Sequence, residues 1–228
     1  MRGLYVPPKN FEQQMRILAY FGFRGLSMSA AMPYLKGDKR GKVAVITFDD
    51  GYCDNIEHAL PILKMFVFSA TCYFVSERVG QSNLWDAERE SITKPLMSWP
   101  QIAAWHAEGM EVGAHSRTHP RLTACNDQRL DEEVAGCKSD LENRCDIAVT
   151  QFSYPYGDWD ERVAGAVQRA GFHAAATIIP RRADRDDDLF MLPRLAVKGG
   201  KGWRRVARNC LPELFWSLLK KSGHQRVR

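Results

Sequence analysis

The chain has 228 residues, of which 45% are hydrophobic and 26% charged, a composition that excludes a disordered or fibrous protein. It allows one large globular domain or two small ones. The formal net charge is +5, but residues 198–228 hold nine Lys or Arg and one acidic residue, Glu213. Because the rest of the chain is close to neutral, the charge does not indicate nucleic-acid binding.

Helices and strands are predicted to alternate along the chain. Amphipathic periodicity with turn and capping residues at the ends predicts helices over residues 11–21, 55–65, 98–108, 127–143 and 159–170. Short apolar or β-branched runs predict strands over residues 26–28, 42–48, 69–75, 111–114, 149–154, 172–178 and 192–197. This alternation is typical of a mostly parallel sheet with helical crossovers.

The cysteines and the N-terminal residues indicate where in the cell the protein is expected. Six cysteines are scattered along the chain, none of them in a C-x-x-C pair, as is typical of proteins in a reducing compartment. Residues 1–8 lack the apolar core of a signal peptide, and no run approaches the ~18 apolar residues of a membrane span. We therefore expect a cytoplasmic protein.

Residues capable of chemistry follow two of the predicted strands directly. Asp49 and Asp50 end the apolar run that begins at residue 43, and His115 and His119 follow the strand at residues 111–114. The carboxyl ends of parallel strands in a barrel-like fold meet at one face. One carboxylate and two imidazoles can hold a catalytic divalent metal, and the second carboxylate can act as a base on a metal-bound water. The sequence therefore predicts a metal-dependent hydrolase.

Taken singly, each pattern also has a purely structural explanation. An Asp-Asp-Gly turn is common at solvated surfaces, and two histidines four residues apart are often coincidental. Residues 152–157 can be an aromatic strand that ends in a turn, or a rigid loop that offers a backbone N–H to an oxyanion and an aromatic wall to a sugar. However, adjacent carboxylates at a partly buried strand end repel each other unless a cation or proton is present, which favours a metal site.

Together, the three segments resemble the polysaccharide deacetylase family (NodB homology domain, carbohydrate esterase family 4). Thr-Phe-Asp-Asp-Gly at 47–51, His-Ser-Arg-Thr-His at 115–119 and Pro-Tyr-Gly at 155–157 stand in the order of the family's motifs. The resemblance covers about residues 40–197. It implies an α/β fold, a distorted (β/α) barrel of the NodB-homology type, which agrees with the alternation of strands and helices.

The resemblance also implies a role for each site residue. Asp49 is expected to be the general base, while Asp50, His115 and His119 are expected to bind one divalent metal ion, Zn²⁺ being the expected metal. The backbone N–H of Tyr156 is expected to stabilise the oxyanion. The implied reaction hydrolyses the acetamide of an N-acetylated amino sugar in a glycan or a lipid-linked glycan.

Two positions depart from the family's pattern. Ser153 stands where the family has an arginine that steadies the base, and Arg194 stands near the position of the family's histidine acid. We hypothesise that Arg194 reaches the site from the last predicted strand and replaces the missing arginine; the alternative is a surface arginine. No histidine stands in the acid position, so a metal-bound water or a neighbouring group would supply the proton, or activity would be weak or lost.

The two ends of the chain carry further expectations. Family members often begin with a strand that precedes a segment like residues 5–11, so the first barrel strand is either absent or upstream of residue 1. An open sheet edge there would be a route to a homodimer. We expect a deacetylase-like domain over residues 1–200 and a basic amphipathic tail over residues 201–228, which packs on the barrel or lies peripherally on a membrane.

Three functions are compatible with these residues. The first is N-deacetylation of a glycan or lipid-linked sugar. The second is deformylation of a lipid-linked amino sugar, which would use the same residues. The third is a non-catalytic carbohydrate-binding protein that kept the metal and the groove but lost the acid.

Overall fold

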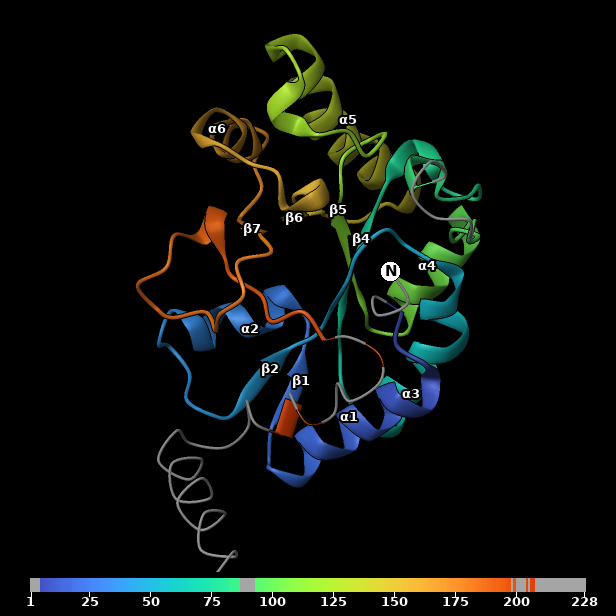
Figure 1. Cartoon of the computed structure of the whole chain (residues 1–228), viewed down its shortest axis with the longest axis vertical. Helices are drawn as coiled ribbons and strands as arrows, with labels where there is room; N and C mark the ends of the chain where they lie inside the picture. Colours follow the sequence, from blue (N-terminus) through green and yellow to red (C-terminus); the bar gives the residue numbers. More distant parts are fainter. Residues whose placement is uncertain (1–4, 87–92, 198, 200–203, 205, 208–228) are drawn as a thin grey trace, which may run out of the picture.

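The computed structural model describes residues 5–86, 93–197, 199, 204, 206 and 207 (Figure 1). Within these residues, five parallel strands form one sheet in the order β3-β4-β5-β6-β7. Their bounds are Thr47–Phe48, Thr71–Phe74, Glu111–Ala114, Gln151–Ser153 and Ala174–Ala176. The strands curl into a half-barrel, so the predicted α/β class and barrel-like arrangement are confirmed.

A second, smaller sheet extends this one. It pairs β1 (Arg24–Leu26) with β2 (Val43–Val45) in parallel. The backbone N–H of Ile46 donates to the Leu26 carbonyl at 3.0 Å, and that of Ser69 donates to the Gly25 carbonyl at 3.1 Å. These bonds join β1 to the segments next to β3 and β4.

Helices surround the sheets, as Figure 1 shows. The α-helices are α1 (Pro8–Tyr20), α2 (Met28–Leu35), α3 (Leu60–Met65), α4 (Trp99–Ala107), α5 (Asp127–Cys145) and α6 (Glu161–Arg169). A π-helical segment, η1 (Asn55–Ala59), precedes α3, and the short 3₁₀ turns are η2 (Ser76–Arg78), η3 (Leu84–Asp86), η4 (Leu122–Ala124), η5 (Pro155–Gly157) and η6 (Leu189–Met191).

Side-chain caps explain where several of these helices begin. The Ser27 hydroxyl accepts from the backbone at the start of α2, and the Asn126 and Asp160 side chains do the same for α5 and α6. Each cap satisfies an N–H group that has no partner inside its helix.

The strand pleat divides the core into two clusters. Cys72 and Phe74 of β4 belong to the large cluster, whereas Tyr73 between them belongs to a small one with Met28 and Leu192. Neighbouring residues of a strand point to opposite faces of its sheet. The large cluster therefore lies on one face of β4 and the small cluster on the other.

Two predictions about elements were wrong in part, and one helix was missed. Residues 192–197 do not form a strand; Leu192 makes only an isolated parallel bridge to Ala176, since Pro193 has no N–H to continue a ladder. The strand expected at 26–28 begins earlier, as β1, because Ser27 already caps α2. Helix α2 itself was not predicted, because it is short and contains Pro33.

Expectations about the chain ends fall mostly outside the described residues. Of the predicted basic tail over 201–228, only residues 204, 206 and 207 are described, all of them helical. The division at residue 200, the peripheral membrane contact, the homodimer and the cytoplasmic location therefore stay predictions. Among the described helices, none has the length and apolar character needed to cross a membrane.

Gly113, in the middle of β5, gives a test of this packing. A Cβ there would come within 2.4 Å of the Tyr73 ring, so we expect Gly113→Ala to lower the free energy of unfolding by about 1–3 kcal/mol. At Gly165 in α6 the nearest atom is the mobile end of Arg169, and Gly165→Ala should be neutral or stabilising. Urea unfolding of the two variants measures both, and equal stability of Gly113→Ala and the unmodified chain would contradict this packing.

Candidate active site

All the predicted site residues lie at the carboxyl end of the main sheet. Each follows a strand or the isolated bridge after β7, in the loop that the topology places at that edge. The residues are Asp49, Asp50, His115, His119, Tyr156 and Arg194.

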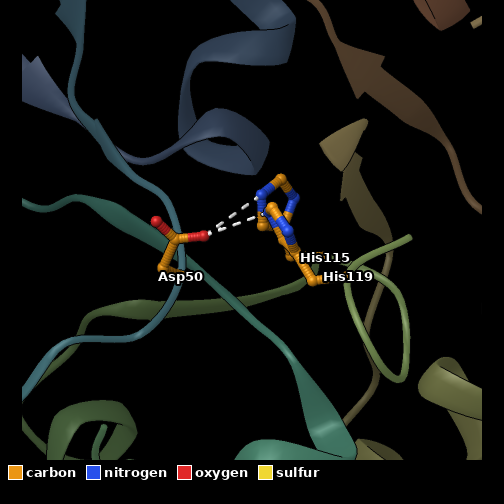
Figure 2. A group of neighbouring side chains, drawn as sticks. All are labelled: Asp50, His115 and His119. Atoms are coloured by element: carbon orange, nitrogen blue, oxygen red, sulfur yellow. Dashed lines mark ion pairs between the residues drawn. The ribbon is translucent and has the colours of Figure 1, made fainter. Parts of the chain in front are cut away.

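Asp50, His115 and His119 form a group that could hold a metal ion. Oδ1 of Asp50 lies 3.6 Å from Nε2 of His115 and 3.4 Å from Nε2 of His119 (Figure 2). These separations exceed the ~2.7–3.2 Å of an ordinary hydrogen bond. Ligand atoms about 2.0–2.2 Å from a tetrahedral zinc ion lie about 3.3–3.6 Å apart, so the spacing fits a metal better than it fits direct pairing.

His115 is in the form that a metal ligand requires. Its Nδ1 lies 2.7 Å from the Ser153 carbonyl oxygen, which can only accept, so Nδ1 carries the hydrogen. Burial lowers the pKa of His115, although the charge of Asp49 opposes this. A neutral imidazole with its hydrogen on Nδ1 has its lone pair on Nε2, the atom that faces Asp50.

His119 is enclosed by two aromatic rings. The Trp85 ring stacks on it with centroids 4.5 Å apart, and the Tyr156 ring meets it at 4.5 Å at a steep angle. Burial, and then the neighbouring His115, lower the pKa of His119 to about 2. His119 is therefore neutral at any ordinary pH.

Trp85 was missed in the sequence. It lies in η3, within the loop between η2 and α4, and its only signal in the sequence is a tryptophan in a polar stretch. A bridge between Ser82 and Pro95 and a 2.6 Å hydrogen bond from the Lys94 N–H to Asn83 hold the base of this loop.

The backbone at the site adopts an uncommon conformation. Asp50, Ser116, His119 and Tyr156 have φ between 58° and 73°, and they are four of the six non-glycine residues with positive φ in the described chain. Such conformations are costly outside glycine and persist only where neighbouring contacts impose them. One such contact is the 3.0 Å hydrogen bond from the His119 N–H to the Ser116 hydroxyl.

Arg194 is paired with Asp49 rather than exposed at the surface. Its Nη1 and Nη2 donate to the two carboxylate oxygens of Asp49 at 2.8 and 2.9 Å, a fork-like pairing that fixes the orientation of both groups. Nη2 also donates to the Ser153 hydroxyl at 3.0 Å, and Nε donates to the Thr177 carbonyl at 2.8 Å. The Arg194 side chain is 16% exposed.

The pairing decides the charge of Asp49. Burial alone raises the pKa of this carboxyl, but the charge of Arg194, then that of His115, and hydrogen bonds from Arg194 and Ser153 lower it to about 2. Asp49 is therefore ionised across the physiological range.

Comparison with known proteins places this site in a family. Residues 36–175 match the family model described as polysaccharide deacetylase. The chain belongs to the polysaccharide deacetylase family. It is 30% identical over 200 residues to YxkH of Bacillus subtilis, a protein named for the same family, with 87% of this chain and 67% of that protein covered.

Further relatives of this chain include an enzyme and proteins of known structure. A poly-β-1,6-N-acetyl-D-glucosamine N-deacetylase of Staphylococcus aureus is 21% identical over 201 residues, covering 86% of this chain and 69% of that one. IcaB from Ammonifex degensii superposes with a TM-score of 0.75 at 25% identity, covering 89% and 88% of the two chains. Streptococcus pyogenes PplD, solved with acetate, superposes with a TM-score of 0.79 at 22% identity over 92% and 89%. The predicted class, a hydrolase of amide C–N bonds, is that of the family.

The pairing with Arg194 predicts the pH at which the Asp49 carboxyl titrates. In the metal-free protein, the Asp49 carboxyl should titrate near pH 2, and in Arg194→Met it should titrate at higher pH because the nearest positive charge is gone. Arg24→Met, which removes a guanidinium bound to Tyr34, should leave Asp49 unchanged. Carboxyl ¹³C NMR would measure all three, and an unshifted midpoint in Arg194→Met would contradict the pairing.

Because the pKa of Asp49 is lowered, the stability of the folded chain should decrease at low pH. The pKa of Asp49 in the folded chain, about 2, lies below its ordinary value of 3.8, so the ionised carboxylate stabilises the folded chain at pH values above 3.8. This contribution to the free energy of unfolding is lost as the pH falls from 3.8 to about 2.

Proposed function

We propose that this chain is a metal-dependent carbohydrate N-deacetylase, which hydrolyses the acetamide of an N-acetylated amino sugar within a glycan or a lipid-linked glycan. One arrangement carries the proposal: a group of one carboxylate and two neutral imidazoles lies beside a second carboxylate that its own arginine holds in place. Three ligands with an open position, next to a separate base, are the parts that metal-assisted hydrolysis needs.

Asp50, His115 and His119 are the proposed ligands, and Zn²⁺ is the proposed metal. Nitrogen and carboxylate donors at these separations suit zinc. When bound, the metal would lower the pKa of a coordinated water and polarise the acetamide carbonyl.

Asp49 is the proposed general base, and Arg194 its positioning partner. Arg194 fixes the orientation of the Asp49 carboxylate through hydrogen bonds. It also makes Asp49 a weaker base, because it lowers the pKa of this carboxyl. A proton that Asp49 takes from water is then readily passed on, and the nitrogen of the departing amine is the group that needs one. This assigns the acid step to Asp49, which removes the need for the family's histidine.

Tyr156 is proposed to act through its backbone. Its positive φ in η5 and the packing of its ring against His119 hold the peptide at the edge of the metal group. The Tyr156 N–H is the proposed donor to the oxyanion of the tetrahedral intermediate.

Measuring acetate release from candidate glycans tests the proposed substrate. The Staphylococcus aureus relative is named for poly-β-1,6-N-acetyl-D-glucosamine, so oligomers of that polymer are the first substrate to compare with chitooligosaccharides. Zinc-dependent acetate release from either supports the proposal. Formate release from an N-formylated lipid-linked sugar alone would favour the deformylase, and tight metal binding without release from any substrate would favour a carbohydrate-binding protein.

Two aspartate variants separate the proposed roles. Asp49→Asn should still bind zinc but lose turnover about 10²–10⁴-fold, because it lacks a base. Asp50→Asn should lose zinc affinity as well, because a proposed ligand is gone. Isothermal titration with zinc and an acetate assay on the same samples measure both properties, and equal zinc loss in the two variants would contradict the assignment.

A further inference from the structure

Arg117 and Thr118, two of the three residues between the histidines, are bound by side chains of one helix, α5. Glu133 of α5 is fully buried, with 0% of its side chain exposed. Its Oε2 accepts from the backbone N–H of Arg117 at 2.9 Å and from that of Thr118 at 2.8 Å, and its Oε1 accepts from the Thr118 hydroxyl. The Glu133 carboxylate thus binds the backbone of the loop that carries both imidazoles.

The buried charge of Glu133 is compensated. Arg129, one turn earlier on α5, lies 2.6 Å from Oε1 of Glu133 and donates to the Thr118 hydroxyl at 3.0 Å. A buried carboxylate is stable only when charge-assisted hydrogen bonds replace its lost hydration. These donors make Glu133 a rigid anchor.

A second anchor lies on the same face of α5. Asp140 accepts from Nε and Nη2 of Arg117 at 2.9 and 3.3 Å, and from the Ser76 hydroxyl at 2.7 Å. At Gly136, between the two acids, an added Cβ would come within 2.7 Å of the Arg117 side chain. Residues 133, 136 and 140 recur at i, i+3 and i+7, so a single face of the helix receives the loop.

The loop requires such an anchor. Ser116 and His119 both have positive φ, and the only residues between them are the two that α5 grips. Without the grip, these strained positions could relax, and Nε2 of His119 would leave its 3.4 Å separation from Asp50.

We infer that Glu133 is a positioning residue of the metal centre, with Asp140 as its second anchor. Glu133 sets the separation of the two imidazoles through the backbone of Arg117 and Thr118, without touching the metal or the substrate. The inference rests on the proposed metal-binding function. Groups that orient metal ligands typically contribute about 10–100-fold to metal affinity.

The test compares zinc affinities of the full chain by chelator competition. Glu133→Gln should bind zinc about 10–100-fold more weakly than the unmodified chain while keeping its circular dichroism spectrum. The d–d absorption of the Co²⁺-loaded protein should change as well, because the ligand geometry relaxes. Asp131→Asn makes the same chemical change at an exposed position of α5 and should change neither property.

A purely structural role for Glu133 gives a different result. It would lower the melting temperature but leave the zinc affinity and Co²⁺ spectrum of the folded protein unchanged, which would overturn the inference. If Glu133→Gln does not fold, Glu133→Asp decides, because it keeps the charge but draws the carboxylate back from the backbone N–H groups of Arg117 and Thr118. Weaker zinc binding by Glu133→Asp supports the inference, and unchanged binding overturns it.

Failure of the proposed function is distinguishable in the same experiment. An unmodified chain that binds zinc no better than Asp50→Asn would overturn the metal site itself, and the inference with it. Zinc binding that depends on Asp50 but not on Glu133 would overturn the inference alone.

Discussion

The pairing of Arg194 with Asp49 is the interaction on which the site depends. Asp49 and Asp50 are adjacent, and two carboxylates in one partly buried place repel each other unless each has a cationic partner. Arg194 donates to both oxygens of Asp49, whereas Asp50 faces the neutral imidazoles of His115 and His119, where the proposed metal would supply the positive charge. The two acids are thereby given different surroundings, which is the condition for giving them different tasks.

The parts of the fold that obey local rules could be predicted from the sequence. Helix α5 has strong periodicity and a capping residue, and its predicted span of 127–143 is close to Asp127–Cys145. The strands before Asp49 and His115 were predicted from short apolar runs, and the parallel topology then put both residues at one edge. Helix α2 and the missing last strand depended on single prolines, whose effect on short elements is hard to weigh.

The parts of the site that depend on contacts between residues far apart in the chain were harder to predict from the sequence. Arg194 was assigned to the site through its place in a family pattern, and its fork on Asp49 joins residues 145 apart in the chain. Trp85 and Glu133 have no pattern around them that shows what they touch. Glu133 reads as a polar residue of an amphipathic helix, and only the packed structure shows that it is buried against the histidine loop.

The most direct test of this account is a crystal structure of the zinc-loaded protein with anomalous diffraction at the zinc edge. The account predicts one ion bound by Asp50, His115 and His119 at about 2.0–2.2 Å, with Asp49 off the metal and still paired with Arg194. An ion bound by Asp49, or zinc found only away from these three side chains, would contradict it.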